Sequence, residues 1–200
     1  MSVSQSRADA DIDNFSLYQI LKGDDQWYTA SLMFVPMLFI VVLNSFNITY
    51  IITDYPAYLE HIHAFQTDPY ASDFYNKYPA FYFIFMGIIG MLGFNTVFKI
   101  KLLFGLIDLL NVAFIIKMVK MISPYSKKTP FFVGFLYFYF PVHLYFLKMG
   151  ENDVVSIFFF IASINFYLEK RFGRSAVMLG FAIMFKIFPI FFLIPITINF

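Results

Sequence analysis

The sequence predicts an all-α fold, a polytopic bundle of membrane-spanning helices, and three observations support this prediction. The chain of 200 residues is 60% hydrophobic and only 14% charged, whereas about a quarter of the residues in a soluble domain are charged. Its mean hydropathy is +0.70. Whole segments are apolar on every side, without the polar face that a surface helix of a soluble protein carries. We therefore expect lipid to surround most of the chain.

Segment length identifies the predicted spans, because a helix needs about 20 apolar residues to cross about 30 Å of hydrocarbon. Four segments meet this criterion, and a fifth, shorter one lies between two polar clusters. We expect them to form one module, residues 27–200, preceded by a polar and acidic cytoplasmic segment, residues 1–26. The five predicted spans cover residues of about 27–52, 97–121, 130–147, 154–168 and 175–199.

The apolar segment 79–94 is shorter than a full span and decides the topology. If it crosses the membrane, many basic residues, such as Lys127 and Arg171, lie outside, against the rule that cytoplasmic loops collect Lys and Arg. If it is only a partial or juxtamembrane helix, most basic residues lie inside. We prefer this second arrangement, which places the loop 53–78 and the cluster Gly150-Glu151-Asn152-Asp153 on the same outer face.

The outer loop offers one candidate for a general base. Residues 55–66 have the apolar spacing of an amphipathic helix, which we expect to lie on the membrane surface. Asp54 precedes this helix, where the first span meets the outer surface. A partly desolvated carboxylate at this boundary is suited to accept a proton from a hydroxyl group. The alternative is that Asp54 only caps the surface helix.

Three further observations limit the chemistry. The chain contains no cysteine, which excludes disulfides, thiolate metal sites and a cysteine nucleophile. The spacing of His61 and His63 directs the two rings to different faces of a helix, so we assign no metal ligands. The net charge of +1 argues against a nucleic-acid partner, because phosphate binding needs a concentrated basic surface.

Charged residues inside or next to the predicted spans are the remaining candidates. Asp108 and Lys186 lie within spans, where an ionised side chain is costly unless it finds a partner. Each can be the counter-ion of the other, or Lys186 can bind a phosphate group as a point charge. Glu151 and Asp153 precede a span, where acids either complement the helix dipole or take part in chemistry.

The segment Gly180-Phe181-Ala182-Ile183-Met184-Phe185-Lys186-Ile187-Phe188-Pro189, with Ile194-Pro195-Ile196-Thr197 after it, resembles a known family. It is similar to the Gly-Phe-Ala-x-x-x-Lys-Ile-Tyr-Pro and Leu-Pro-Ile-Thr sequences of GT-C-type polytopic glycosyltransferases, above all the mannosyltransferases that add the first mannose to GPI anchors. The cluster 150–153 resembles the Gly/Asn/Asp cluster of these enzymes and of related polyprenyl-phosphate-sugar transferases. Asp108-Leu109-Leu110 and Tyr78-Pro79 follow the order of the family. In the first outer loop, Thr53-Asp54-Tyr55 keeps only the second acid of the family's Asp-x-Asp-Tyr motif.

This resemblance implies a GT-C-like N-terminal module that transfers a hexose, with mannose preferred, from a polyprenyl or dolichyl phosphate. The acceptor is a hydroxyl group of a lipid, glycan or protein on the outer or lumenal face. No cofactor is assigned, and a divalent cation is left open. The resemblance assigns catalysis to Asp54, Asp153 and Glu151, and substrate binding to Tyr55, Tyr78, Asn152 and Lys186.

A second class of function stays open at this point. Members of the family are longer than this chain, so it can instead be a truncated, non-catalytic membrane scaffold or an accessory subunit that needs a partner subunit. A transporter fragment is a weaker alternative, because no second half supplies an inverted repeat. A multi-pass protein of the plasma membrane or the endoplasmic reticulum fits either class.

Overall fold

The computed structural model describes residues 24–46, 54–67, 80–141, 143–145 and 153–192 of the chain. Every element within these residues is a helix, which confirms the predicted all-α fold. The elements are α3 (Asp24–Phe46), α4 (Asp54–Thr67), α5 (Ala80–Met91), α6 (Val97–Ile122), α7 (Thr129–Tyr139), α9 (Asp153–Leu168), α10 (Phe172–Phe185) and the 3-10 helix η1 (Phe188–Phe192).

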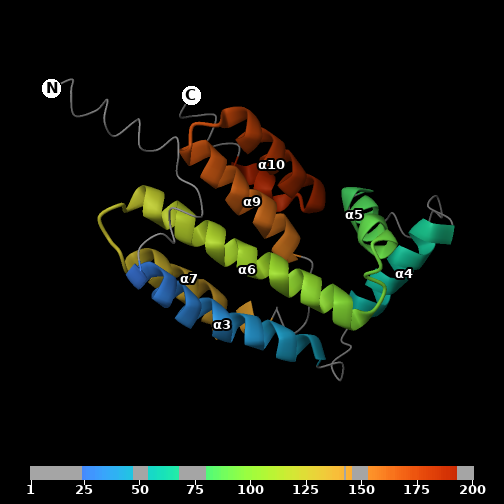
Figure 1. Cartoon of the computed structure of the whole chain (residues 1–200). Coiled ribbons are helices and arrows are strands. Elements are labelled where there is room, and N and C mark those ends of the chain that lie inside the picture. The colour runs from blue at the N-terminus through green and yellow to red at the C-terminus, as the bar shows by residue number, and fades with distance from the viewer. Residues whose placement is uncertain (1–23, 47–53, 68–79, 142, 146–152, 193–200) are drawn as a thin grey trace.

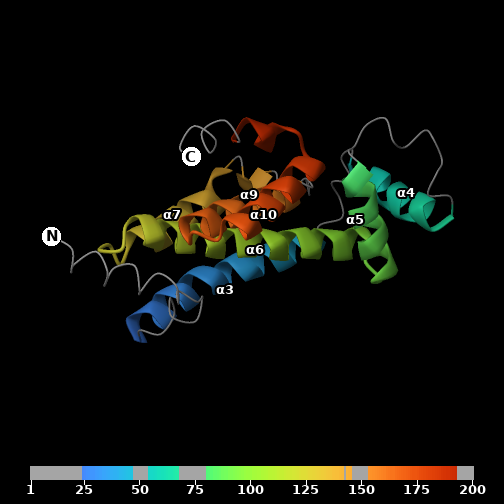
Figure 2. The ribbon, with the colours of Figure 1, turned by 90° about the horizontal axis from the view of Figure 1, so that it is seen from above.

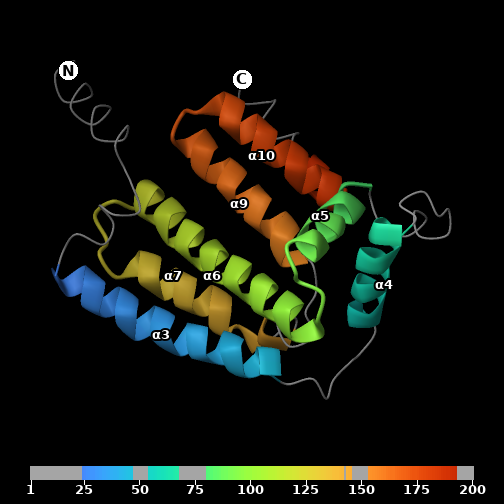
Figure 3. The same ribbon diagram turned by 45° about the vertical axis from the view of Figure 1, so that its right-hand side comes forward.

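The long helix α6 lies at the centre of the molecule (Figure 1). Helices α3 and α7 pack along one side of it, and α9 packs along the other side with α10 beside it. The pair α4 and α5 lies at the end where α6 begins (Figures 2 and 3). The start of α9 and the end of α10 point towards this same end. Helices that are distant in the sequence therefore direct these termini to the same side of the bundle.

Helix α3 has two apolar faces. Met33, Met37 and Val41 are buried at intervals of four residues and pack against α6 and α7. The opposite face exposes large apolar side chains, among them Val35 and Phe39, which are 64% and 62% exposed. A helix that is apolar on both faces needs lipid on the side that protein does not cover. The exposed face of α3 therefore fits a membrane bundle.

Two helices of the described part are long and apolar enough to cross a membrane by length and composition, namely Thr29–Phe46 and Val97–Ile122. The other apolar helices are shorter, Phe81–Met91, Thr129–Tyr139, Asp153–Leu168 and Phe172–Phe185. The helical membrane bundle that the composition predicts is thus confirmed as a fold class. The bounds of the individual spans differ from the prediction at two prolines.

The predicted spans 130–147 and 175–199 are both interrupted. Helix α7 ends at Tyr139, and Phe140 is extended, with φ −61° and ψ 127°. The following residue is Pro141, which disfavours helical backbone in the residue before it. Helix α10 ends at Phe185, and Lys186 is extended at φ −146° and ψ 139°. Proline at 189 cannot donate a backbone hydrogen bond, and the described residues that follow Lys186 form the short 3-10 helix η1. The prediction of uninterrupted helices was wrong for these two segments.

The segment 79–94 does not carry the chain to the opposite end of the bundle. Helix α5 has 12 residues, about 18 Å at 1.5 Å per residue. It ends in a turn at Gly93, whose φ of +88° suits glycine. The last residue of α3, Phe46, lies against Phe98 at the start of α6, with ring centroids 4.8 Å apart. Because α3 ends where α6 begins, the short helix α5 agrees with the partial helix of the preferred topology, and the side of the membrane stays a prediction.

The amphipathic helix predicted over residues 55–66 is also confirmed, as α4. Tyr58 and Ile62 are buried in the apolar core that α4 shares with α5, α6 and α9. Two glycines of α5 permit this close packing, since a Cβ atom at Gly87 would overlap the ring of Phe65, and one at Gly90 would overlap Ile62. Helices α4 and α5 therefore form a compact unit beside the start of α6.

Candidate functional site

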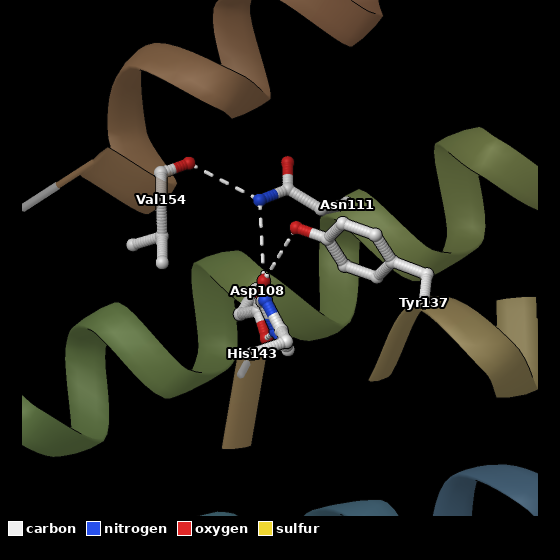
Figure 4. Close-up of polar contacts among 5 residues, drawn as sticks. All are labelled: Asp108, Asn111, Tyr137, His143 and Val154. Carbon is white, nitrogen blue, oxygen red and sulfur yellow. Dashed lines mark hydrogen bonds and ion pairs between the residues drawn. The ribbon is translucent and has the colours of Figure 1, made fainter. Parts of the chain in front are cut away.

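A buried carboxylate lies in the middle of α6, and hydrogen bonds around it connect α6 with α7, with His143 and with the start of α9 (Figure 4). Asp108 is fully buried. Its Oδ2 atom accepts a hydrogen bond from His143 Nε2 at 2.6 Å, and its Oδ1 atom accepts one from the Tyr137 hydroxyl at 3.0 Å. Asn111 donates through Nδ2 to Asp108 Oδ1 at 3.4 Å and to the backbone oxygen of Val154 at 3.1 Å. We call these four side chains, Asp108, Asn111, Tyr137 and His143, the Asp108 cluster.

This arrangement confirms that Asp108 faces the interior but corrects its expected partner. The sequence left open a pairing between Asp108 and Lys186. In the structure Asp108 Oδ2 contacts His143 Nε2 at 2.6 Å, and Lys186 pairs with Asp153 instead. The reason is the break after Phe185, which places Lys186 at the end of α10 and not inside a continuous span.

Asp153 and Lys186 form an ion pair between the first residue of α9 and the residue after α10. Their side chains are 34% and 38% exposed. Two of the predicted site residues, separated by more than thirty positions in the sequence, are therefore brought together. The pair is open to its surroundings on one side, so a ligand can approach it.

Two hydrogen bonds to the backbone carbonyl of Ala182 fix the end of α10 next to the ion pair. The backbone oxygen of Ala182 accepts from the hydroxyl of Ser156 at 3.1 Å and from the backbone N–H of Lys186 at 3.0 Å. Ser156 lies in the first turn of α9 and is buried. The first turn of α9 and the last turn of α10 are thus tied together directly beneath the ion pair.

The Asp153–Lys186 pair lies level with the middle of α6. The bond from Asn111 to Val154 aligns the start of α9 with Asn111, which lies about 21 Å along the axis from Val97. The first half of α6 therefore extends beyond the beginning of α9, and α5 packs beside α10 in this region. The Asp108 cluster and the ion pair form one polar layer across the bundle, here called the polar layer.

Aromatic side chains line the contact between α5, α9 and α10 just below Lys186. The ring of Phe185 lies 5.1 Å from those of Phe81 and Phe85 and 5.7 Å from that of Phe159, between centroids. Phe181 stacks on Phe81 at 5.1 Å. The ion pair is therefore bordered on the protein side by a rigid apolar surface, which suits a ligand that combines a charged group with a hydrocarbon chain.

The other predicted site residues are only partly placed. Asp54 and Tyr55 begin α4, but their side chains lie outside the described part of the structure. Tyr78, Glu151 and Asn152 also lie outside the described residues. The structure thus brings together Asp153 and Lys186, and it places the helix that Asp54 begins at the same end of the bundle. The roles of these residues stay predictions.

The two histidines of α4 separate as expected. His61 is buried and shares a hydrogen bond with the Tyr82 hydroxyl at 3.4 Å, whereas His63 is exposed. Burial lowers the pKa of His61 below its ordinary value, against a smaller raising effect of Glu60. Among the described side chains, no group of three or more His, Cys, Asp or Glu residues could hold a metal ion.

Sequence reasoning missed three members of the Asp108 cluster, His143, Tyr137 and Asn111. A signal for His143 was present, because an imidazole within an apolar segment needs a polar partner. Tyr137 and Asn111 carried no comparable signal, since tyrosine and asparagine occur in many helices without a functional reason. Their importance depends on which helices pack against each other, and that is a property of the tertiary fold.

The sequence model of glycosyltransferase family 87 matches residues 75–199, which is more than half of the chain. The match includes the Asp108 cluster, Asp153 and Lys186, and it does not include Asp54. No curated protein and no solved structure matches the chain. This match supports the predicted polytopic glycosyltransferase, whereas the finer resemblance to GPI mannosyltransferases is not confirmed by it.

Proposed function

Because the chain belongs to glycosyltransferase family 87, we propose that it transfers a hexose, with mannose preferred, from a polyprenyl or dolichyl phosphate to a hydroxyl group. We place this reaction on the outer or lumenal side of a multi-pass membrane protein. The acceptor is a lipid, a glycan or a protein. The observation that carries the proposal is the partly exposed Asp153–Lys186 pair inside the segment that the family model matches.

The depth of this pair favours a lipid-linked substrate. With the end of α6 at Ile122 on the cytoplasmic boundary, the polar layer lies roughly 10 Å below the outer boundary of a hydrocarbon core about 30 Å thick. Charged side chains at such a depth are costly unless they face protein partners or a polar ligand. A donor whose phosphate is attached to a long hydrocarbon chain can reach this depth from the lipid, with its chain along the aromatic surface.

We assign the phosphate to Lys186. The acceptor oxygen forms a new bond to the anomeric carbon, and the bond between that carbon and the phosphate oxygen breaks. The electron pair of that bond leaves with the lipid phosphate, whose charge an ammonium group stabilises without giving up a proton. Asp153 releases Lys186 from its ion pair when the donor phosphate binds, and it is then available to orient the acceptor, with Glu151 and Asn152 beside it in the sequence.

The proton of the acceptor hydroxyl needs a base on the opposite side of the sugar from the phosphate. We assign this role to Asp54, because it begins α4, which lies at the end of the bundle towards which the start of α9 points. Tyr55 and Tyr78 are assigned to sugar binding, since their rings offer both an apolar face and a hydroxyl group. No step in this scheme requires a metal ion, and a divalent cation remains an open question for the assay.

The test follows labelled mannose from polyprenyl-phosphate-mannose in membranes that contain the wild-type chain, Lys186→Gln or Asp153→Asn. We expect both variants to lose most of the transfer, about tenfold or more, because a hydrogen bond to a charged group contributes about 1.5–3 kcal/mol. The matched control is the ion pair at the other end of α6, where Lys117 contacts Glu169. Lys117→Gln should retain transfer per amount of folded protein.

Three outcomes separate the alternatives. Equal loss in Lys186→Gln and in the Lys117→Gln control would mean that stability, and not the site, explains the effect. Unchanged transfer in Asp54→Asn would remove Asp54 from the mechanism while leaving the reaction in place. If the wild-type chain transfers no sugar from any polyprenyl- or dolichyl-phosphate donor, the proposed function is contradicted and the non-catalytic accessory subunit is favoured.

A further inference from the structure

We propose that Asn111 is a positioning residue, which holds the first turn of α9, and with it the Asp153–Lys186 pair, in place against α6. This inference rests on the proposed function of that pair. Asn111 makes no contact with either charged side chain among the hydrogen bonds of the described residues. It acts through the backbone of Val154, the residue directly after Asp153.

The amide group of Asn111 is held in one orientation by two acceptors. Its Nδ2 atom donates to Asp108 Oδ1 at 3.4 Å and to the Val154 backbone oxygen at 3.1 Å. An amide nitrogen has two N–H groups, so this arrangement uses both. The carbonyl oxygen Oδ1 of Asn111 is buried and has no hydrogen-bond partner in the described part of the chain. The amide is therefore oriented by the two acceptors and not by its own oxygen.

The Asp108 carboxylate can orient Asn111 because it is itself fixed. Tyr137 and His143 donate to it from outside α6, at 3.0 and 2.6 Å. The ring of His143 also packs on Tyr137, with centroids 4.5 Å apart. These two rings thus fix Asp108, Asp108 orients Asn111, and Asn111 holds the first turn of α9 (Figure 4).

The first turn of α9 needs such a support because its other side-chain interactions among the described residues, the Asp153–Lys186 pair and the bond from Ser156 to Ala182, both lead to the end of α10 and not to α6. Ser156 ties α9 to α10, and Asn111 ties α9 to α6. Without Asn111 the start of α9 can move relative to α6 while its bond to α10 remains. Displacements of about 1 Å are enough to reduce catalysis strongly when they alter the position of reacting groups.

The chain provides a matched control for this inference. Asn165 forms a second amide bridge between the same two helices, near the end of α9. Its Nδ2 atom donates to the backbone oxygens of Phe114 at 3.1 Å and Ile161 at 2.9 Å, and its Oδ1 atom is likewise buried without a partner among the described residues. Asn165 therefore has the same chemistry and the same burial as Asn111, but it lies away from the ion pair.

The experiment compares Asn111→Ala with Asn165→Ala in the full chain in membranes. Both variants lose one amide bridge, so we expect similar decreases in thermal stability. Only Asn111→Ala should lower kcat at saturating donor, by about tenfold. This is the size of effect that the loss of about one buried hydrogen bond gives. Asn111→Gln retains an amide donor and should recover part of this loss.

A second measurement does not depend on sugar transfer. The chain has no cysteine, so Val155→Cys introduces a single thiol at a buried position of the first turn, which is 2% exposed. We expect a water-soluble maleimide to label this thiol slowly in the otherwise unchanged chain and in the Asn165→Ala background. In the Asn111→Ala background labelling should be about tenfold faster, because the first turn is no longer held against α6.

The outcomes distinguish this inference from the proposed function. Equal kcat in Asn111→Ala and Asn165→Ala, with transfer abolished in Lys186→Gln, would overturn the positioning role and leave the transferase intact. Equal labelling rates in the two backgrounds would overturn it as well. If the wild-type chain transfers no sugar, the proposed function fails, and the labelling rates still decide whether Asn111 holds the first turn of α9.

Discussion

Replacing Asp108 by alanine should destabilise the protein more than any other single change in the polar layer. The carboxylate is fully buried and accepts two short hydrogen bonds, from His143 at 2.6 Å and from Tyr137 at 3.0 Å. Alanine leaves both donors buried without this acceptor. A hydrogen bond to a charged group contributes about 1.5–3 kcal/mol, and we expect the loss of these two bonds in Asp108→Ala to cost about 3–5 kcal/mol.

Thermal unfolding of the purified protein in detergent measures this effect. For a chain of this length, about 1 kcal/mol shifts the melting temperature by about 2–4 °C, so the expected decrease is about 6–20 °C. Asp108→Asn keeps an oxygen acceptor in a side chain of the same shape and should lose less than half as much. Leu110→Ala is the control, because it lies on the same helix with a side chain that is 48% exposed.

A double-mutant cycle tests whether the loss of stability comes from the interaction of Asp108 with His143. In the Asp108→Ala background, His143→Ala should cost much less than it does in the wild-type chain, because the interaction is already lost. Additive effects of the two substitutions would mean that the pair contributes nothing of its own. A decrease for Asp108→Ala no larger than that for Leu110→Ala would refute the reasoning about the buried carboxylate.

Three further predictions concern other parts of the bundle. Ser156→Ala should lower sugar transfer more than Ser163→Ala, although each hydroxyl donates to a backbone oxygen of α10, at 3.1 and 2.9 Å, because only Ser156 lies beside the ion pair. Acidification below pH 6.5 should destabilise the protein through His61, whose lowered pKa means that the unfolded chain binds more protons there. Gly105→Ala should cost about 1–3 kcal/mol, because its Cβ atom would overlap Val41 of α3.

Each of these predictions has a control within the chain. The two serine variants are compared with each other, and equal transfer would contradict the first prediction. A His61→Gln chain should lose part of its sensitivity to acid between pH 7.5 and 5.5, and an unchanged pH profile of the melting temperature would contradict the second. Gly173→Ala is the control for the third, because a Cβ atom there meets nothing within 4 Å.

The fold class followed from the sequence because composition and segment length are sufficient to identify apolar helices. Helix bounds were less predictable. The breaks before Pro141 and at Lys186 lie within apolar segments, where hydropathy is uniform and only the local effect of proline ends the helix. Reading those prolines as helix ends would have placed Lys186 at a helix terminus and not in the middle of a span.

The sequence selected Asp153 and Lys186 but did not predict that they pair. It left open a pairing of Lys186 with Asp108, whose carboxylate contacts His143 instead. Pairing depends on the level at which each helix begins and ends along its neighbours. No local pattern contains that information, because it follows from the packing of α9 and α10 on α6.

The start of α9 relative to α6 explains the position of the ion pair. Lys117, five residues before the end of α6, contacts Glu169, the residue after α9. Helix α6 has 26 residues and α9 has 16. The bond from Asn111 to Val154 places the start of α9 about 21 Å along α6 from Val97. A late start of α9 and an early end of α10 therefore place two charged side chains below the outer end of α6, at a depth that a phosphate on a lipid chain can reach.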